Sequence, residues 1–332
     1  MKKILNRPAD YVNEMLDGLC AAHPQYYRRT GAEGRVVVST SAPIGGKVGI
    51  VTGGGSGHLP VFTGYLGAGL ADACAIGDVF SSPGVDLMTD AIRAADGGAG
   101  VLRLYGNYGG DRMNFDMAGE MMEMEGIRTT TVLVADDVSS AGPEERHKRR
   151  GVAGLVLCYK MAGAKAAAGA SLDEVTALAQ KAADSCRSVG VALTPCTVPC
   201  AGRPTFSIGE DEMEIGMGIH GEPGVRRGPL RTADEIVAEM LGMLLADMPL
   251  GAGDRVAVLV NSLGATPLEE LYIAYRYVAA ALGGLGVTVI SPLVGRYATS
   301  MEMAGMSITF AKLDAELEAL WKAPCDCPFL KV

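Results

Sequence analysis

Short apolar runs alternate with segments of helical composition along this chain, and this alternation limits its fold more than any other feature. In the first half the runs cover Lys47–Thr52, Val101–Tyr105 and Thr129–Ala135, and each is followed by glycine or a polar residue. Two stretches of helical composition follow, near 152–168 and 172–187. Because parallel strands need long crossover connections, strands that alternate with helices predict a largely parallel sheet covered by helices.

The second half of the chain repeats this pattern, and an amphipathic helix near 10–22 precedes the first half. The expected strands lie at Val189–Leu193, Met213–Ile219, Arg255–Asn261, 287–291 and 307–312, and the expected helices at Ala233–Leu245, at 267–281 and just before Trp321. No low-complexity linker separates the two halves. We therefore predict an α/β protein with two α/β domains and mainly parallel or mixed sheets, an N-terminal domain at 1–185 and a C-terminal domain at 186–332.

The composition supports a large core and excludes two classes of partner. Of 332 residues, 48% are hydrophobic and 20% are charged, which favours a packed core over disorder. The net charge of −9 gives no electrostatic footprint for nucleic acid. No apolar window is long enough to span a membrane, and the first residues lack a signal-peptide core. We expect a cytoplasmic protein that binds neither membrane nor nucleic acid.

One basic run and the cysteines complete the survey. The run Arg146–Arg150 is interpreted as the solvated start of a helix, with contact to a phosphate group as the alternative. The eight cysteines are expected to be thiols in a reducing compartment. Zinc needs about four convergent ligands, and no histidine lies near either close cysteine pair, Cys196/Cys200 or Cys325/Cys327. We therefore predict no metal site.

A glycine-rich segment, Thr52–His58, follows the first apolar run. Glycines let a backbone approach a ligand closely, and the carboxyl end of a parallel strand is where α/β proteins bind ligands. The segment has neither the Lys-Ser/Thr pair of a P-loop nor the glycine spacing of a dinucleotide fingerprint. It therefore predicts a ligand-approaching loop that ends in His58, with a purely structural turn as the alternative.

Two further polar clusters follow predicted strands. Asp111 comes after Asn107-Tyr108-Gly109-Gly110, where its carboxylate can accept a hydroxyl proton or cap the next helix. His220 lies among glycines at the predicted end of the strand Met213–Ile219. A neutral imidazole is a nucleophile toward ketones, although a single histidine can equally be structural or bind a metal. Since two of the four histidines fall in such clusters, we expect them to share a site.

These clusters resemble the dihydroxyacetone kinase family, and specifically its substrate-binding (DhaK-type) subunit. The matching segments run along nearly the whole chain: Gly53–His58, Asn107-Tyr108 with Gly110-Asp111, Asn114-Phe115, Arg149–Ala153, Cys196–Pro199, Glu212–Glu214, Gly218–Gly224 and Leu263–Pro267. The triple-glycine segment and His220-Gly221-Glu222-Pro223-Gly224 are specific together.

The resemblance implies a role for each matching residue. His220 would form a covalent hemiaminal with the carbonyl carbon of a short-chain ketose, His58 would hydrogen bond to the substrate, and Asp111 would act as base toward the hydroxyl that is phosphorylated. Further substrate contacts would come from Gly53, Gly54, Ser56 and Gly57. The substrate would be dihydroxyacetone or a four-carbon ketose. Because the chain ends at Val332, we expect a separate nucleotide-binding (DhaL-type) subunit to supply ADP or ATP with Mg²⁺, and we expect a homodimer.

The sequence departs from the family pattern at four positions near these motifs. Gly109 replaces a frequent threonine and Ser262 a frequent asparagine, and the other two positions lose a charge. Leu59 stands where the family often has glutamate, and Gly106 where it often has lysine. These changes leave the identity of the substrate open, because they remove two charged side chains and create additional space beside the site. A non-catalytic sensor that binds the same ketose is the alternative function, although the presence of Asp111 favours an enzyme. The missing fingerprint argues against a nicotinamide oxidoreductase.

Overall fold

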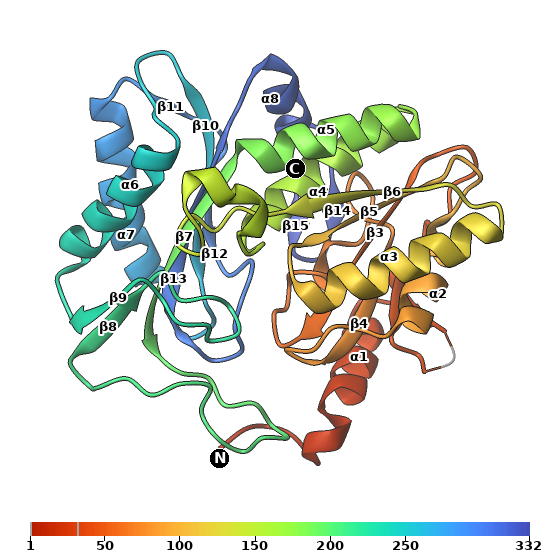
Figure 1. Ribbon diagram of the computed structural model, residues 1–332, viewed down its shortest axis with the longest axis horizontal. Helices are drawn as coiled ribbons and strands as arrows, with labels where there is room; N and C mark the ends of the chain where they lie inside the picture. Colours follow the sequence, from red (N-terminus) through yellow and green to blue (C-terminus); the bar gives the residue numbers. More distant parts are fainter. Residues whose placement is uncertain (1, 32) are drawn as a thin grey trace.

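Two sheets flanked by helices make up the computed structural model, which describes residues 2–31 and 33–332. The first is a six-stranded sheet in the order β1-β2-β4-β3-β5-β6, with β3, β4, β5 and β6 parallel and β1 and β2 antiparallel at one side (Figure 1). Its strands are β1 (Tyr27–Thr30), β2 (Val36–Ser39), β3 (Gly49–Ser56), β4 (Ala73–Val79), β5 (Val101–Gly106) and β6 (Thr129–Val134). Strands β3 and β5 are buried along their whole length, as expected for continuous apolar runs in a covered parallel sheet.

Helices cover both faces of the first sheet. On one face lie α2 (Val85–Ala95) and α3 (Gly109–Met124), and on the other α1 (Tyr11–Ala22), α4 (Gly154–Ala167) and α5 (Leu172–Ser185). Three short 3₁₀ helices accompany them: η1 (Pro8–Asp10), η2 (Thr63–Tyr65) and η3 (Pro143–Lys148). Helix α5 begins with a reciprocal capping box between Ser171 and Glu174, which supplies partners for two backbone donors at its start.

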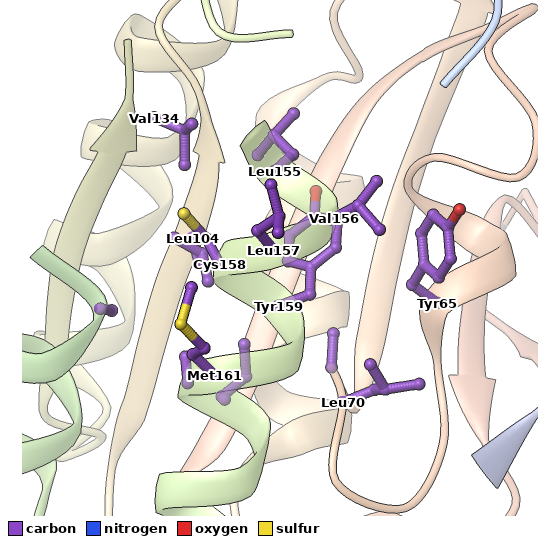
Figure 2. Packing of buried hydrophobic residues seen from close by; sticks show 14 of the residues in the cluster. Tyr65, Leu70, Leu104, Val134, Leu155, Val156, Leu157, Cys158, Tyr159 and Met161 are labelled. Carbon is purple, nitrogen blue, oxygen red and sulfur yellow. The ribbon is translucent and has the colours of Figure 1, made fainter. Parts of the chain in front are cut away.

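Helix α4 is buried on all sides. Its residues from Gly154 to Ala164 are covered, and apolar side chains surround the helix (Figure 2). A helix that is apolar around its whole circumference belongs in a protein interior. The polar groups it carries have partners there. The Tyr159 hydroxyl lies 2.6 Å from Thr52 Oγ1, and Lys160 Nζ donates to Leu320 O at 2.8 Å.

The second sheet has the order β11-β10-β13-β7-β8-β9, with β12 paired to β10, and its pairs are mostly antiparallel. Its strands are β7 (Cys186–Thr194), β8 (Glu212–Ile215), β9 (Arg226–Pro229), β10 (Arg255–Ser262), β11 (Thr288–Val289), β12 (Leu293–Gly295) and β13 (Ala304–Lys312). Helices α6 (Ala233–Asp247) and α7 (Leu268–Gly284) pack on one face through side chains such as Val237 and Val278.

The end of the chain returns to the first sheet. Helix α8 (Ala315–Lys322) and the hairpin of β14 (Asp326–Cys327) and β15 (Leu330–Lys331) share one core with α4 and α5, in which Trp321 is buried. Lys181 of α5 pairs with Glu316 at 2.9 Å. A domain boundary at 185 stays a prediction, and the residues after Leu313 pack against the N-terminal part of the chain.

The predicted fold class is confirmed, and most predicted elements match within a few residues. Strand β3 runs from Gly49 to Ser56, so the expected glycine loop is largely strand. Strand β8 ends at Ile215 and does not reach Ile219, because positive φ at Gly216 turns the chain out of the sheet. None of the helices in the described ranges combines the length and the apolar character of a membrane span.

Candidate active site

Strands β3 and β5 separate at their carboxyl ends. They are paired only from Gly49 to Val51, whereas β3 continues along β4 as far as Ser56 and β5 continues along β6 as far as Gly106. The chain leaves β3 for β4 on one side and returns to β5 on the other, so the strand order switches at this point. A switch point at the carboxyl end of a parallel sheet is the usual ligand position in α/β folds.

The glycines of β3 allow close packing next to this gap. A Cβ on Gly54 would collide with the Phe62 ring, and one on Gly55 would stand 2.6 Å from the backbone nitrogen of Ser81. Gly57 has φ +101°, which other residues rarely adopt. The structural alternative therefore explains these glycines in part. Substrate contacts by Gly53, Gly54, Ser56 and Gly57 stay a prediction, and the Ser56 hydroxyl is buried without a hydrogen-bond partner in the described chain.

His58 is buried in the turn after β3, with 1% of its surface exposed. Its Nδ1 lies 2.6 Å from the carbonyl oxygen of Thr299. A carbonyl can only accept a hydrogen bond, so Nδ1 carries the proton and Nε2 keeps its lone pair. Nε2 is buried and unpartnered within the described residues. Burial, with a smaller effect of His220, lowers the pKa of His58 to about 3, and the ring is therefore neutral.

His220 lies in the loop that joins β8 to β9, not at the end of a strand as the sequence suggested. Both carboxylate oxygens of Glu222 hold it: the imidazole Nδ1 lies 2.9 Å from Oε1, and the backbone N–H donates to Oε2 at 2.9 Å. Burial would raise the pKa of Glu222, but the hydrogen bond and charge of His220 and the charge of Arg150 lower it to about 2. The ionised carboxylate thus fixes the Nδ1–H tautomer and leaves Nε2 free to react.

Aromatic rings surround His220. The His58 ring stands edge to face with it at a centroid distance of 4.7 Å, and Tyr108 and Phe80 lie at 4.8 and 5.3 Å. Phe80 also stacks on His58 at 4.8 Å while its backbone has φ +58°. Non-glycine residues in this region are uncommon and cluster at functional sites. The two predicted histidines therefore share one aromatic-walled site.

Asp111 occupies the first turn of α3 and is 9% exposed. It is not the helix cap, since Tyr108 holds the N-cap position. Ser82 Oγ donates to Asp111 Oδ1 at 2.7 Å. Burial raises the pKa of Asp111 to about 6, and the Ser82 hydrogen bond and the charge of His220 oppose that rise. A carboxylate with this pKa is a stronger base than an ordinary aspartate, which fits the predicted role.

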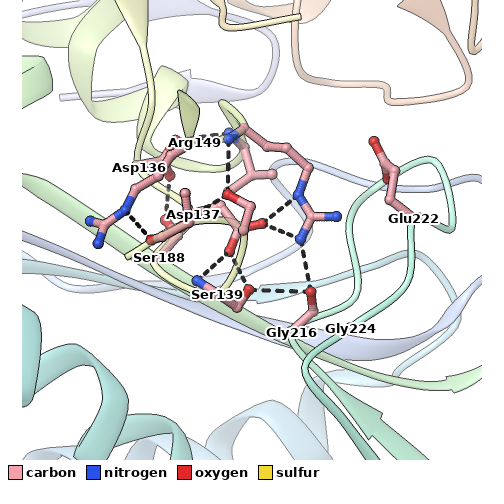
Figure 3. Close-up of polar contacts among 12 residues, drawn as sticks. Asp136, Asp137, Ser139, Arg149, Ser188, Gly216, Glu222 and Gly224 are labelled. Atoms are coloured by element: carbon pink, nitrogen blue, oxygen red, sulfur yellow. Dashed lines mark hydrogen bonds and ion pairs between the residues drawn. The ribbon is translucent and has the colours of Figure 1, made fainter. Parts of the chain in front are cut away.

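The basic run contacts the loop that carries His220. Its interpretation as the solvated start of a helix is wrong for Arg149 and Arg150. Arg150 pairs with Asp137 at 2.7 Å and donates to Gly216 O at 2.8 Å. Ser139 Oγ donates to the same carbonyl at 3.2 Å (Figure 3). The Arg149 side chain is 1% exposed and pairs with Asp247. The buried guanidinium of Arg149 and the partly buried guanidinium of Arg150 are thus each paired with a carboxylate, which offsets the cost of removing the charge from water.

Leu59 and Gly106, which stand where the family often has charged residues, face different surroundings. Leu59 lines a cavity of about 410 Å³ that Ser56, Gly57 and Thr299 also line. A Cβ on Gly106 would stand 3.2 Å from the ring of Tyr108, which contacts His220. Position 106 can therefore affect the site through Tyr108, and Leu59 lies beside residues of the glycine segment and the partner of His58.

Two further observations concern a second cavity and the absence of a metal-ligand cluster among the described residues. A larger cavity of about 630 Å³ lies between β6 and α5 and includes none of the predicted site residues. Among the described residues, no three His, Cys, Asp or Glu side chains gather as the ligands of a metal ion would. Sequence reasoning did not assign roles to Phe80, Ser82, Glu222 or Thr299, and only Glu222, two residues after the motif histidine, had a signal in the sequence.

Comparison with known proteins decides the family, because the model of the Dak1 domain matches residues 17–329. The chain belongs to the Dak1 family. It is 47% identical, over the full length of both chains, to the dihydroxyacetone-binding subunit DhaK of PTS-dependent dihydroxyacetone kinase 2 from Listeria innocua. It is 44% identical to L-erythrulose kinase from Pectobacterium atrosepticum, where 99% of this chain covers 56% of the relative. Kinases and kinase subunits among these relatives give the family a phosphotransferase role.

Solved structures of Dak1 relatives have the same fold. The dihydroxyacetone kinase of C. freundii superposes with a TM-score of 0.89 at 34% identity, with 98% of this chain and 59% of that chain covered. The dihydroxyacetone kinase operon co-activator Dha-DhaQ superposes with a TM-score of 0.87 at 33% identity, with coverages of 94% and 96%. This chain spans 59% of the C. freundii kinase.

Proposed function

We propose that this chain is the ketose-binding subunit of a dihydroxyacetone-type kinase. It would hold a short-chain ketose covalently on His220 and present a hydroxyl to Asp111, while a separate nucleotide-binding subunit supplies the phosphoryl group. One observation carries the proposal: Glu222 fixes the His220 ring through Nδ1 and leaves Nε2 as a nucleophile beside the neutral ring of His58.

Capture of the ketose is an addition to its carbonyl carbon. The Nε2 lone pair of His220 forms the new C–N bond, and the π electrons of the carbonyl move to its oxygen, which takes up one proton. The ring becomes cationic and stays hydrogen bonded to the Glu222 carboxylate. A polyol has no electrophilic carbon and cannot form this bond, so covalent capture selects ketoses and fixes their geometry before transfer.

His58 completes the binding of the captured substrate. Its Nδ1–H is used by Thr299 O, so Nε2 can only accept a hydrogen bond. A hydroxyl of the adduct would be the donor that this buried atom lacks in the described chain. Because burial holds the pKa of His58 at about 3, the ring stays an acceptor across the physiological range.

Asp111 would take the hydroxyl proton as the oxygen attacks phosphorus. Its pKa of about 6 leaves it ionised near pH 7 and still basic enough to assist this transfer. Ser82 orients the carboxylate. Phosphoryl transfer also needs neutralisation of charge on the phosphate, and we expect the nucleotide and Mg²⁺ to be held by the partner subunit.

A second function, a non-catalytic ketose sensor, is favoured by the similarity to the operon co-activator. A sensor needs His220 and hydrogen bonds to the substrate, but it has no need for a buried carboxylate with a raised pKa. We therefore prefer the enzyme, and phosphorylation of the ketose in the presence of the partner subunit distinguishes the two.

The direct test is native mass spectrometry of the chain after incubation with dihydroxyacetone and, separately, L-erythrulose. We expect one added ketose per chain. The adduct should disappear in His220→Ala and persist in His147→Ala, a matched control because His147 is an exposed histidine outside the site. An adduct that survives His220→Ala would show that the ketose is held in another way.

The proposal also covers the identity of the ketose and the oligomeric state of the subunit. Dihydroxyacetone and erythrulose are both candidates because the named relatives include kinases of each. We propose a homodimer, with domains that meet near residue 185, as the assembly that binds the donor subunit.

A further inference from the structure

An uncommon backbone conformation is concentrated around His58. Four residues other than glycine have positive φ among the described residues. Three of them, Phe62, Phe80 and Met301, contact His58 or its neighbour Gly57. Positive φ is unfavourable for a residue with a Cβ, and it persists where surrounding contacts enforce it, as they do at functional sites. Around His58 this conformation brings two phenylalanine rings against the imidazole.

The two rings, Phe62 and Phe80, form what we call the aromatic clamp. Phe80 stacks on His58 at a centroid distance of 4.8 Å and an interplanar angle of 23°, and Phe62 stands edge to face with it at 5.9 Å and 80°. The hydrogen bond between His58 Nδ1 and Thr299 O, at 2.6 Å, adds a polar contact at the ring edge. Contacts from nearly perpendicular directions thus set the plane of the His58 ring.

The glycine-rich segment makes room for the aromatic clamp. A Cβ on Gly54 would collide with the Phe62 ring. A Cβ on Gly55 would stand 2.8 Å from Phe80 Cα, and one on Gly57 would stand 2.8 Å from Phe80 Cε1. Because no side chain fits at these distances, glycine is required at all three positions. Three glycines of the segment that predicts a ligand-approaching loop therefore accommodate two phenylalanines.

The turn that carries Phe80 also reaches the other predicted catalytic residues. The Phe80 ring lies edge to face with His220 at 5.3 Å and 76°. Among the described residues it is the one phenylalanine or tyrosine ring that pairs with both His58 and His220. Two residues later in the same turn, Ser82 Oγ donates to Asp111 Oδ1 at 2.7 Å. One short turn is therefore in side-chain contact with all three residues.

We propose that Phe80 is a positioning residue for ketose capture. Together with Phe62 it sets the plane of the His58 ring, spaces that ring from His220 and keeps water from His58 Nε2. A hydrocarbon ring offers neither a proton nor a nucleophile, so Phe80 acts through the two histidines. This inference rests on the proposed function, because the arrangement of the two rings matters for capture only if both contact one substrate.

The test compares three variants of the full chain. Glycine adopts a φ of +58° without strain, so Phe80→Gly removes the ring and keeps the turn. Phe80→Leu keeps much of the apolar volume but not the flat ring. Phe310→Leu is the control, since it trims a buried ring in the core of the second sheet.

Two properties of each variant are measured. Nitrogen-15 NMR of the histidine-labelled chain, without ketose and between about pH 4 and pH 8, reports the charge and tautomer of His58. The chain has four histidines, so their signals can be assigned by substitution. Calorimetry gives the Kd for dihydroxyacetone at neutral pH.

In the wild type, His58 should stay neutral with its proton on Nδ1 throughout this pH range. In Phe80→Gly, water reaches the ring, so His58 should titrate within the range, toward the ordinary histidine pKa of about 6.5. The Kd should rise at least about tenfold, because His58 and His220 are no longer held at a fixed spacing. Phe80→Leu should show the same two changes in smaller measure, and Phe310→Leu should match the wild type in both.

An unchanged Kd in Phe80→Gly, or a His58 ring that stays neutral in that variant, would overturn the positioning role and leave the proposed function standing. Equal losses in Phe310→Leu would show a general effect of core trimming, and the proposal would be wrong. If Phe80→Gly does not fold, Phe80→Leu decides by the same two measurements. Failure of the wild type to capture ketose would instead overturn the proposed function, while the NMR titration needs no ketose and still tests the aromatic clamp.

Discussion

Replacing Asp111 by Asn should stabilise the fold while it abolishes phosphoryl transfer. The pKa of Asp111 rises from 3.8 to about 6 on folding because burial disfavours the charged form. Each pH unit corresponds to about 1.4 kcal/mol, so the ionised carboxylate costs about 3 kcal/mol of stability at pH 7. The asparagine amide oxygen can still accept the hydrogen bond of Ser82, so the Ser82 hydroxyl keeps its partner when the charge is removed.

The sign of the pH dependence makes the measurement specific. The raised pKa of Asp111 means that its cost is complete above pH 6 and fades as the pH falls toward 3.8, where the unfolded carboxyl also binds its proton. The difference in unfolding free energy between Asp111→Asn and wild type, from urea titrations at several pH values, should fall from about 3 kcal/mol at pH 7 to near zero at pH 3. Other groups titrate equally in both proteins and cancel in the difference. A variant that is less stable than wild type at pH 7, or a difference that does not change with pH, would refute the reasoning.

Three further predictions concern the site. Activity should rise as the pH increases through about 6, because Asp111 must be ionised to act as base and His58, with a pKa of about 3, adds no second limb; a rate profile that is flat between pH 5 and 7 would contradict this. Glu222→Gln keeps one acceptor, for the His220 Nδ1–H, but it removes the negative charge that stabilises the cationic adduct and leaves the His220 backbone N–H facing an NH2 group. The Kd for dihydroxyacetone should therefore rise roughly 10- to 100-fold, and an unchanged Kd by calorimetry would exclude the orienting role. Gly106→Lys should lower the ratio of kcat/KM for erythrulose to that for dihydroxyacetone, since a side chain there adds bulk 3.2 Å from the Tyr108 ring, which contacts His220; an equal ratio would show that position 106 does not set substrate size.

The regular elements were predictable because their signals are local. The apolar run Val101–Tyr105 and the alanine-rich helix near 152–168 appear in the structure within a few residues of their expected ends. The strand expected to end at Ile219 stops at Ile215 instead. A turn with positive φ at Gly216 and an Arg150 hydrogen bond to its carbonyl take over there, and neither depends on hydrophobic periodicity.

The predicted site was only partly accessible from sequence. His58, Asp111 and His220 stand in recognisable motifs, and the edge-to-face contact of the two histidine rings brings segments 162 positions apart into one place. The residues that set their chemistry have no comparable signal. Phe80 reaches His58 from a strained turn, and Thr299 reaches it from a distant loop. Their roles come from tertiary contacts that no local pattern records.

The hydrogen bond between His58 and Thr299 makes the substrate-accepting tautomer of His58 depend on both halves of the chain. His58 follows the first sheet, while Thr299 lies in the loop before β13 of the second sheet, and two backbone bonds, Met301 N–H to Gly57 O at 2.8 Å and Thr299 N–H to His58 O at 3.3 Å, join the same segments. If this junction opens, His58 loses the acceptor that holds its proton on Nδ1, and its Nε2 is no longer reserved for the substrate. Fragments 1–185 and 186–332 expressed separately should therefore not capture ketose individually, and capture should return only to the extent that they reassociate.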